Sequence, residues 1–195
     1  MMPREMLKGK LIVPEELSTF HDKVKGLGKK IVFTAGSWDM IHVGQMRYLT
    51  EAKKLGDVLV VGVNSNQSIR TVKGPNKPIM DEWIRAETLC FLKCVDFVTI
   101  VPLPSCKTTV ELLKPDVFVS VKEDYTGDHK NSIEYKTVLG YGGKFIIIPR
   151  QSLYLSTTQI AKRVIGGQFA EMLKDYMNES DSPIKERYLK AKSEK

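Results

Sequence analysis

Apolar residues gather in five short runs that are nearly continuous rather than alternating with polar residues. The runs cover residues 31–34, 58–63, 97–101, 117–121 and 145–148. They are rich in valine, isoleucine and phenylalanine, which favour strands. A strand buried on both faces has this composition, because neither face meets water. The pattern therefore predicts five buried strands of a parallel sheet.

Segments with helical character lie between these runs. In residues 42–56, Val43, Met46, Leu49 and Ala52 recur every three residues, and the segment closes with glycine, a common helix C-cap. Further helices are predicted at residues 14–25, 81–93, 108–113, 132–139 and 156–165. Strand and helix thus alternate, which predicts an α/β fold: a doubly wound, Rossmann-like parallel sheet with helices on both faces.

The same pattern divides the chain into three parts. Residues 1–29 are predicted to form a leader with one helix, residues 30–166 the α/β domain, and residues 167–195 a C-terminal helix and a charged tail. In a doubly wound sheet, right-handed crossovers bring the strand C-termini and the helix N-termini to one edge. Ligands are expected at that edge.

Composition narrows the class of ligand. The 195 residues include 42% hydrophobic and 27% charged residues, as in ordinary globular domains. No apolar run approaches the roughly 20 residues of a membrane span, and the first residues do not resemble a signal peptide. With three cysteines, an odd number, a cytoplasmic protein without a membrane partner is expected. The net charge of +7 suits a polyanion such as a nucleotide or a sugar phosphate.

A nucleic acid is the less favoured polyanion. The sequence contains no nucleic-acid recognition motif and no basic stripe interleaved with aromatic residues. Steeply salt-dependent binding to random DNA would support this alternative.

The stretch GSWDMIHVGQ, residues 36–45, follows the first predicted strand and opens the first crossover helix. Free backbone N–H groups at a helix N-terminus attract anions, so this is the phosphate position of the architecture. Neither a Walker A motif nor G-x-G-x-x-G follows the strand, so side chains would have to assist. His42 lies in the first turn and can donate into the site. Taken alone, one histidine at a helix start is more often a structural group.

Three further features have ordinary explanations when each is taken alone. Ser156, Thr157 and Thr158 open the last predicted helix and can cap it or bind phosphate. Residues 73–78, KGPNKP, read as a rigid basic turn. Arg85, on the following helix, would ordinarily be a solvated charge.

Together and in this order, these features resemble the HIGH-motif nucleotidyltransferase superfamily. The resemblance is strongest to its cytidylyltransferase-like branch, typified by the nucleotidyltransferase domain of ADP-heptose synthase. That family reads roughly G-x-F-D-x-x-H-x-G-H where this chain has GSWDMIHVGQ. The similarity continues through residues 52–57, 61–65, 72–79, 85, 95–96, 142–143 and 156–160, and covers about residues 10–165.

The resemblance implies a Mg²⁺-dependent nucleotidyltransferase. A phosphate oxygen of a phosphorylated sugar or polyol attacks the α-phosphorus of a nucleoside triphosphate, CTP or ATP, and pyrophosphate leaves. Catalysis is then mostly alignment and neutralisation of charge. The family often forms dimers, so a homodimer is expected.

The resemblance also implies roles for residues of this chain. His42 contacts the phosphates in the transition state, while Lys73 and Arg85 neutralise phosphate charge. Replacing Lys73 or Arg85 by alanine is expected to weaken binding or turnover and leave the fold intact. The nucleotide-binding residues are Thr34, Gly36, Trp38, Gly44, Gln45, Ser156, Thr157 and Thr158. Asp39 lies near the Mg²⁺ or holds the loop.

The chain departs from the family at four places near the expected site. Gln45 replaces the second histidine of the motif, Trp38 replaces a phenylalanine or tyrosine, and Lys77 stands where arginine is usual. Residues 120–125, SVKEDY, replace a glycine-containing segment near the acceptor or the nucleoside. A catalytically impaired homologue that binds nucleotide as a sensor or partner subunit is therefore the alternative function.

Overall fold

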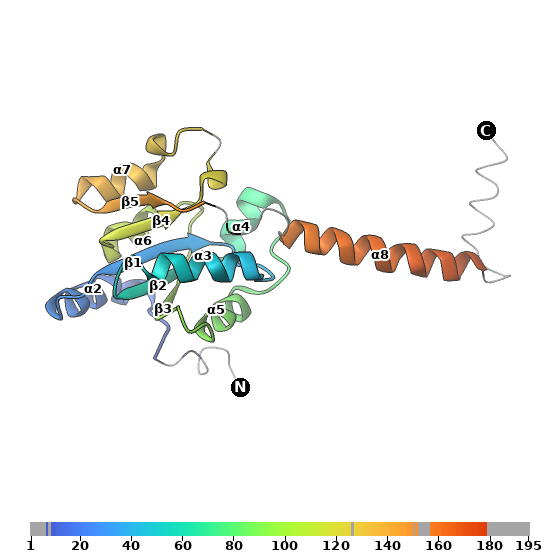
Figure 1. The fold of residues 1–195 in the computed structure, drawn as a ribbon, viewed down its shortest axis with the longest axis horizontal. Coiled ribbons are helices and arrows are strands. Elements are labelled where there is room, and N and C mark those ends of the chain that lie inside the picture. Colours follow the sequence, from blue (N-terminus) through green and yellow to red (C-terminus); the bar gives the residue numbers. More distant parts are fainter. Residues whose placement is uncertain (1–6, 8, 126, 150, 152–156, 179–195) are drawn as a thin grey trace. The chain divides into compact units, whose positions relative to one another are not determined.

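The computed structural model describes residues 7, 9–125, 127–149, 151 and 157–178 (Figure 1). The chain divides into two compact units, Met1–Tyr154 and Leu155–Lys195. Among the described residues, no helix is long and apolar enough to cross a membrane.

The first unit is built on a five-stranded sheet in the order β3-β2-β1-β4-β5, with every pairing parallel. The strands are β1 (Ile31–Gly36), β2 (Val58–Asn64), β3 (Phe97–Val101), β4 (Val117–Ser120) and β5 (Lys144–Ile147). The five apolar runs thus form the five predicted strands. In β2, six successive residues are buried, which explains why the sequence pattern does not alternate.

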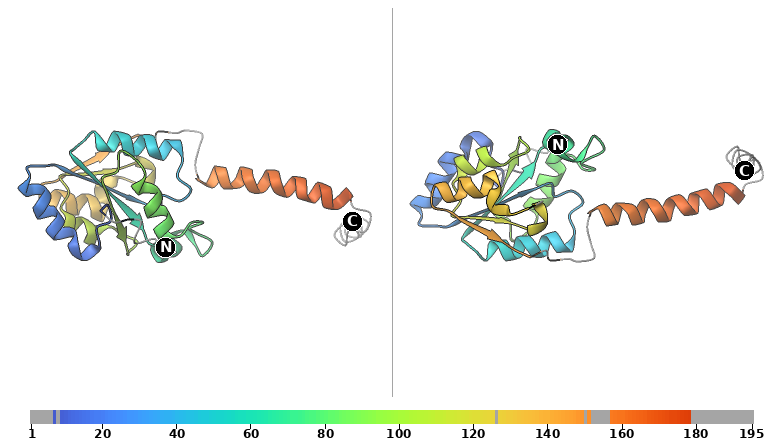
Figure 2. Two further views of the ribbon diagram at one scale, coloured as in Figure 1. Left: turned by 90° about the horizontal axis from the view of Figure 1, so that it is seen from below. Right: turned by 90° about the horizontal axis from the view of Figure 1, so that it is seen from above.

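Two layers of helices cover the sheet. The helices of the first unit are α2 (Leu17–Gly26), α3 (Val43–Lys53), α4 (Asn66–Lys73), α5 (Glu82–Cys90), α6 (Lys107–Leu113) and α7 (Ile133–Gly140). Three short 3-10 turns, η1 (Pro14–Glu16), η2 (Lys122–Asp124) and η3 (His129–Asn131), accompany them. Figure 2 shows the helices on both sides of the strands.

Alternate residues of the strands feed two separate cores. Val32 and Val61 pack with residues of α3 and α5, whereas Phe33 and Val60 pack with residues of α2, α6 and α7. Successive side chains of a strand point to opposite faces, so one apolar run supplies both cores. The doubly wound α/β prediction is confirmed.

Residues 10–12 protect an edge of the sheet. Leu11 forms a parallel bridge with Val98, and the Ile12 N–H donates to the Val98 carbonyl at 2.9 Å. The Lys10 ammonium donates to the carbonyls of Cys90 and Val95 at 2.8 and 3.0 Å. This segment covers part of the outer edge of β3, which would otherwise present unpaired backbone groups.

Two helices differ from the sequence prediction. Helix α4 was not predicted, because its eight residues include only two apolar ones, Ile69 and Val72, which are too few to reveal a helical repeat; Ser65 caps it by accepting the Ser68 N–H at 3.0 Å. Helix α8 (Thr157–Asn178) runs past the predicted end at Ile165 and continues into the C-terminal helix predicted within residues 167–195, so two predicted helices form one. The residues that follow Gly166 and Gly167 are mostly good helix formers, which allows the helix to continue through the glycines.

Candidate active site at the carboxyl edge of the sheet

The loop 37–42 connects the end of β1 to the start of α3. Strand β1 lies between β2 and β4, and the direction of the crossovers reverses on its two sides. A crevice at the carboxyl end of the sheet is expected at such a switch point. The structure therefore places GSWDMIHVGQ where a doubly wound fold binds ligands.

This loop has an unusual backbone that tertiary contacts stabilise. Trp38 and Met40 both have positive φ angles, 50° and 47°, which side-chain-bearing residues adopt at a cost of about 1–2 kcal/mol. The Trp38 ring is 7% exposed, and its indole N–H donates to the Gly62 carbonyl at 2.8 Å. A Cβ atom on Gly36 would lie 3.2 Å from this ring. The indole thus anchors the loop to β2.

Asp39 joins the loop to a second segment of the site. Its two carboxylate oxygens accept the N–H groups of Ile79 and Met80 at 2.8 and 3.0 Å, and the residue is 7% exposed. This arrangement favours the loop-holding alternative over the metal ligand. No cluster of three or more His, Cys, Asp or Glu side chains suited to a metal occurs among the described residues.

His42 is the N-cap residue of α3, and Gln45 is bonded to it. The Gln45 amide oxygen accepts the His42 backbone N–H at 3.1 Å, as a glutamine at this position does in a capping box. The oxygen is thereby committed to the helix start. The amide nitrogen is the end of Gln45 that can donate to a ligand.

Arg85 is fully buried rather than solvated. Its guanidinium donates to the carbonyls of Met80 and Ser37 at 2.9 and 2.5 Å and to the Asn66 side-chain oxygen at 2.9 Å. Burial lowers the pKa of Arg85, while the nearby carboxylate of Asp39 raises it. The ordinary expectation of a solvated charge is wrong. The expectation that Arg85→Ala leaves the fold intact also conflicts with these contacts.

Lys73 reaches the same loop from the last turn of α4. Its ammonium donates to the Ser37 hydroxyl at 2.9 Å, and it is exposed. Ser37 is thus contacted by Arg85 at its carbonyl and by Lys73 at its hydroxyl. Sequence reasoning did not select Ser37; its place directly after Gly36, before the helix, was the available signal.

Thr34 and the segment after β4 complete this region. The Thr34 hydroxyl is hydrogen-bonded to the Tyr48 hydroxyl at 2.8 Å, and both residues are buried. Burial raises the pKa of Tyr48 well above its usual range, and the charges of Asp124 and Tyr125 act in the same direction. Residues 120–125, the segment that differs from the family pattern, therefore lie close enough to Tyr48 and Thr34 for their charges to act on the floor of the site.

Comparison with known proteins decides the family. The Cytidylyltransferase-like family matches residues 33–163 of the chain. The chain belongs to this family.

Among curated relatives, the Bifunctional protein HldE of Syntrophotalea carbinolica is 36% identical over 156 residues, which are 80% of this chain and 31% of that protein. Its counterpart in Geobacter metallireducens is 43% identical over 124 residues, 64% of this chain and 25% of that protein. The chain thus spans about a third or less of the curated relatives that it matches. A solved structure, the lipopolysaccharide core biosynthesis protein from Thermoplasma volcanium, aligns with a TM-score of 0.53 at 31% identity, over 63% of this chain and 97% of that one.

Within the first unit, the structure brings together part of the predicted site. Thr34, Gly36, Trp38, Asp39, His42, Gly44, Gln45, Lys73 and Arg85 all lie on β1, the loop after it, the first turns of α3, or α4 and α5. Thr157 and Thr158 begin α8 and belong to the second unit. Ser156 lies outside the described residues.

Proposed function

We propose that this chain transfers a nucleoside monophosphate from a nucleoside triphosphate to a phosphorylated sugar or polyol and releases pyrophosphate. The observation that carries the proposal is the convergence of Lys73 and Arg85 on Ser37, in a chain of the cytidylyltransferase-like family. The phosphorylated acceptor is inferred from the relatives. Because the chain spans only part of them, the acceptor, the choice between CTP and ATP, and a homodimeric state are proposals.

Lys73, Arg85 and His42 have different roles in this proposal. Lys73 is exposed and its ammonium needs only to leave the Ser37 hydroxyl to reach a phosphate. Arg85 is a positioning residue, since its three hydrogen bonds fix the loop that carries His42. His42, at the start of α3, donates to the phosphate oxygens as negative charge develops, where backbone N–H groups also point.

Mg²⁺ enters as the complex with the nucleoside triphosphate. The Asp39 carboxylate does not fit a ligand role in the observed geometry, because both of its oxygens accept backbone N–H groups. Mg²⁺ in phosphate-transfer sites is commonly held largely by substrate phosphates and water. When bound there, the ion neutralises charge on the triphosphate.

Gln45 sets the expected rate. It offers a neutral N–H where the family has a second histidine that can be charged. Loss of a preorganised donor costs about 2.7–4 kcal/mol in known oxyanion holes, so replacement of a charged donor by a neutral one is expected to cost less. The protein is therefore expected to be slow rather than inactive.

The deciding experiment measures pyrophosphate release with each of the four nucleoside triphosphates against a panel of phosphorylated sugars and alcohols. Turnover with one pair is expected, and His42→Ala should lower the rate far more than it lowers nucleotide affinity. Gln45→His should raise turnover by about tenfold, or roughly 1.4 kcal/mol of barrier. Lys136→Gln, an exposed change on α7, is the control and should behave as wild type.

The alternative function, nucleotide binding without turnover, rests on the same glutamine. It is supported if a nucleoside triphosphate with Mg²⁺ raises the melting temperature while neither wild type nor Gln45→His releases pyrophosphate. A His42→Ala protein as active as wild type would contradict the catalytic role of the loop.

A further inference from the structure

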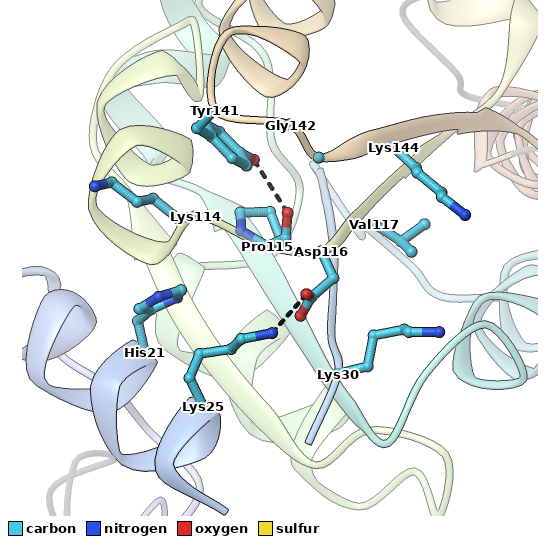
Figure 3. Close-up of a pocket in the computed structure, with 11 residues that line it drawn as sticks. His21, Lys25, Lys30, Lys114, Pro115, Asp116, Val117, Tyr141, Gly142 and Lys144 are labelled. Atoms are coloured by element: carbon cyan, nitrogen blue, oxygen red, sulfur yellow. Dashed lines mark hydrogen bonds and ion pairs between the residues drawn. The ribbon is translucent and has the colours of Figure 1, made fainter. Parts of the chain in front are cut away.

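A second cavity lies at the amino edge of the sheet, where the strands begin. It has a volume of about 430 Å³ and is lined by residues of α2, the starts of β4 and β5, and the turn after α7 (Figure 3). This volume lies within the range of small-molecule sites, roughly 300–1,000 Å³. The strands of a parallel sheet all begin at one edge, so this cavity is distinct from the carboxyl-edge site.

The cavity is lined by four lysines and one carboxylate. The lysines are Lys25, Lys30, Lys114 and Lys144, and the carboxylate is Asp116, which gives a formal charge of four positive and one negative, or +3. His21 also lines the cavity, and its Nδ1–H donates to the Leu113 carbonyl at 2.9 Å. Excess positive charge in a concave site concentrates anions.

The one carboxylate is neutralised locally. Asp116 accepts the Lys25 ammonium at 2.6 Å and the Ile31 N–H at 2.8 Å. Burial by itself raises the pKa of Asp116, but these hydrogen bonds outweigh it and the pKa is lowered. Lys25 and Asp116 thus satisfy each other, and the remaining charge belongs to the other lysines.

Within the described residues, the ammonium groups of those lysines have no carboxylate partner; the Asp57 carboxylate accepts only the backbone N–H of Lys30, at 2.8 Å. Among the described residues, no ion pair involves Lys30, Lys114 or Lys144. In Figure 3 their ammonium groups lie away from the drawn carboxylate, while Lys25 is turned toward it. Three uncompensated positive charges around one cavity repel one another unless an anion or solvent screens them.

Helix dipoles reduce this charge but do not cancel it. The C-terminal ends of α2, α6 and α7 lie beside the lining residues Lys25, Lys114 and Tyr141. Each helix end carries at most about half a negative charge, so three ends supply about 1.5. The side chains supply +3, so the cavity remains positive.

The turn after α7 keeps the wall of the cavity close to the sheet. A Cβ atom on Gly143 would lie 2.7 Å from the Tyr141 ring and 3.0 Å from the Pro115 carbonyl oxygen. Gly142 has a φ of 86°, which favours glycine. The Tyr141 hydroxyl donates to the same Pro115 carbonyl at 3.2 Å, so this wall is defined by packing and hydrogen bonding.

We propose that this amino-edge cavity is a second anion site, which binds a small molecule bearing two or more phosphate charges. Lysine ammonium groups act as point charges suited to phosphate, and no arginine lines the cavity to recognise a planar carboxylate. The limited volume favours a small phosphorylated molecule over a nucleic acid. The site is independent of the proposed nucleotidyl transfer.

The test is a calorimetric titration with inorganic tripolyphosphate at low salt without divalent metal. The double variant Lys30→Gln/Lys144→Gln is compared with Lys93→Gln/Lys136→Gln, which removes the same charge from exposed positions outside the cavity. In the Lys30→Gln/Lys144→Gln variant, the affinity of one class of site for tripolyphosphate should fall by about tenfold or more. The Lys93→Gln/Lys136→Gln variant should bind tripolyphosphate as wild type does. Lys144→Glu should weaken the same class further. All four lysines are exposed, so folding should be retained, as thermal unfolding can verify.

Two outcomes would overturn the proposal: unchanged affinity in the cavity variant, or equal weakening in both double variants. If tripolyphosphate also binds at the candidate active site, Lys73→Ala should lower the affinity of that site and leave the amino-edge cavity unchanged. Pyrophosphate release should persist in the cavity variant. If no turnover is ever found, but the cavity variant alone loses tripolyphosphate binding, the second site stands and the proposed function fails.

Discussion

At the carboxyl edge of the sheet, the Arg85 guanidinium is fully buried and donates three hydrogen bonds to protein oxygens. At the amino edge, Lys30, Lys114 and Lys144 are exposed and form no ion pair within the described part of the chain. One edge thus holds a buried positive charge in a network of hydrogen bonds, whereas the other has exposed positive charges lining a cavity. Preorganisation is what catalysis requires, because a fixed group need not reorganise during the reaction.

The difference between the edges affects the stability of the fold only at the carboxyl edge. A buried guanidinium must be fully hydrogen-bonded, so its partners become part of the fold. Exposed lysines are solvated whether or not an anion is bound. Substitutions should therefore separate the two edges by their effect on the free energy of unfolding.

The largest effect is expected for Arg85→Ala. Loss of the guanidinium leaves the carbonyls of Ser37 and Met80 and the Asn66 side-chain oxygen without their donor, and it opens a cavity. The free energy of unfolding should fall by about 3 kcal/mol or more. Urea denaturation of this variant beside Lys136→Ala measures the difference. A loss below about 0.5 kcal/mol, the range of surface substitutions, would refute the distinction between the edges.

Asp39→Asn should have the next largest effect. The amide keeps the shape of the carboxylate but can accept only one of the Ile79 and Met80 N–H groups well, since its NH₂ group faces the other. A loss of about 2 kcal/mol in the free energy of unfolding is expected. Proteolysis near residues 79–80 should also become faster. Unchanged stability and protection would mean that Asp39 does not hold this segment.

A smaller loss is expected for Trp38→Phe. The phenyl ring can fill much of the buried space, but the Gly62 carbonyl loses the indole N–H. About 1 kcal/mol should be lost, together with some fixation of the positive-φ loop. Thermal unfolding measures the first effect, and nucleotide affinity measures the second. If the variant matches wild type in both, the indole is not the anchor of the loop.

The smallest effects are expected for Lys73→Ala and Lys144→Ala, one from each edge. Both side chains are exposed, so each free energy of unfolding should change by less than about 0.5 kcal/mol. Their ligands should separate them: Lys73→Ala should weaken nucleoside triphosphate binding, and Lys144→Ala should weaken tripolyphosphate binding at the amino edge. If both variants weaken the binding of the two ligands equally, the ligands do not bind at two separate sites but are attracted nonspecifically by positive charge.

Much of the fold could be predicted from the sequence. Continuous apolar runs such as Val58–Val63 are adequate evidence for buried strands, because no other short element needs apolar residues on every side. Helix α4 could not be predicted in this way. It is eight residues long and has only two apolar residues, Ile69 and Val72, so its sequence carries a cap but too few apolar positions to reveal a helical repeat.

The sequence indicated which residues belong to the candidate site but not which contacts they make. GSWDMIHVGQ identified the loop, since its position between a strand and a helix is local information. The burial of Arg85, and its bond to a carbonyl 48 positions earlier, depends on how α5 packs near β1. No local pattern distinguishes a buried arginine from a solvated one.

The sequence by itself determined the alternation of strands and helices, the family, and the position of the loop GSWDMIHVGQ, because each of these is expressed in neighbouring residues. Only the tertiary structure decided which charges are buried and which are free. Arg85 and Lys144 are both single basic residues in the first half of an element. Packing encloses the first among backbone carbonyls and leaves the second at a solvent-exposed cavity rim, and burial sets what a charge can do.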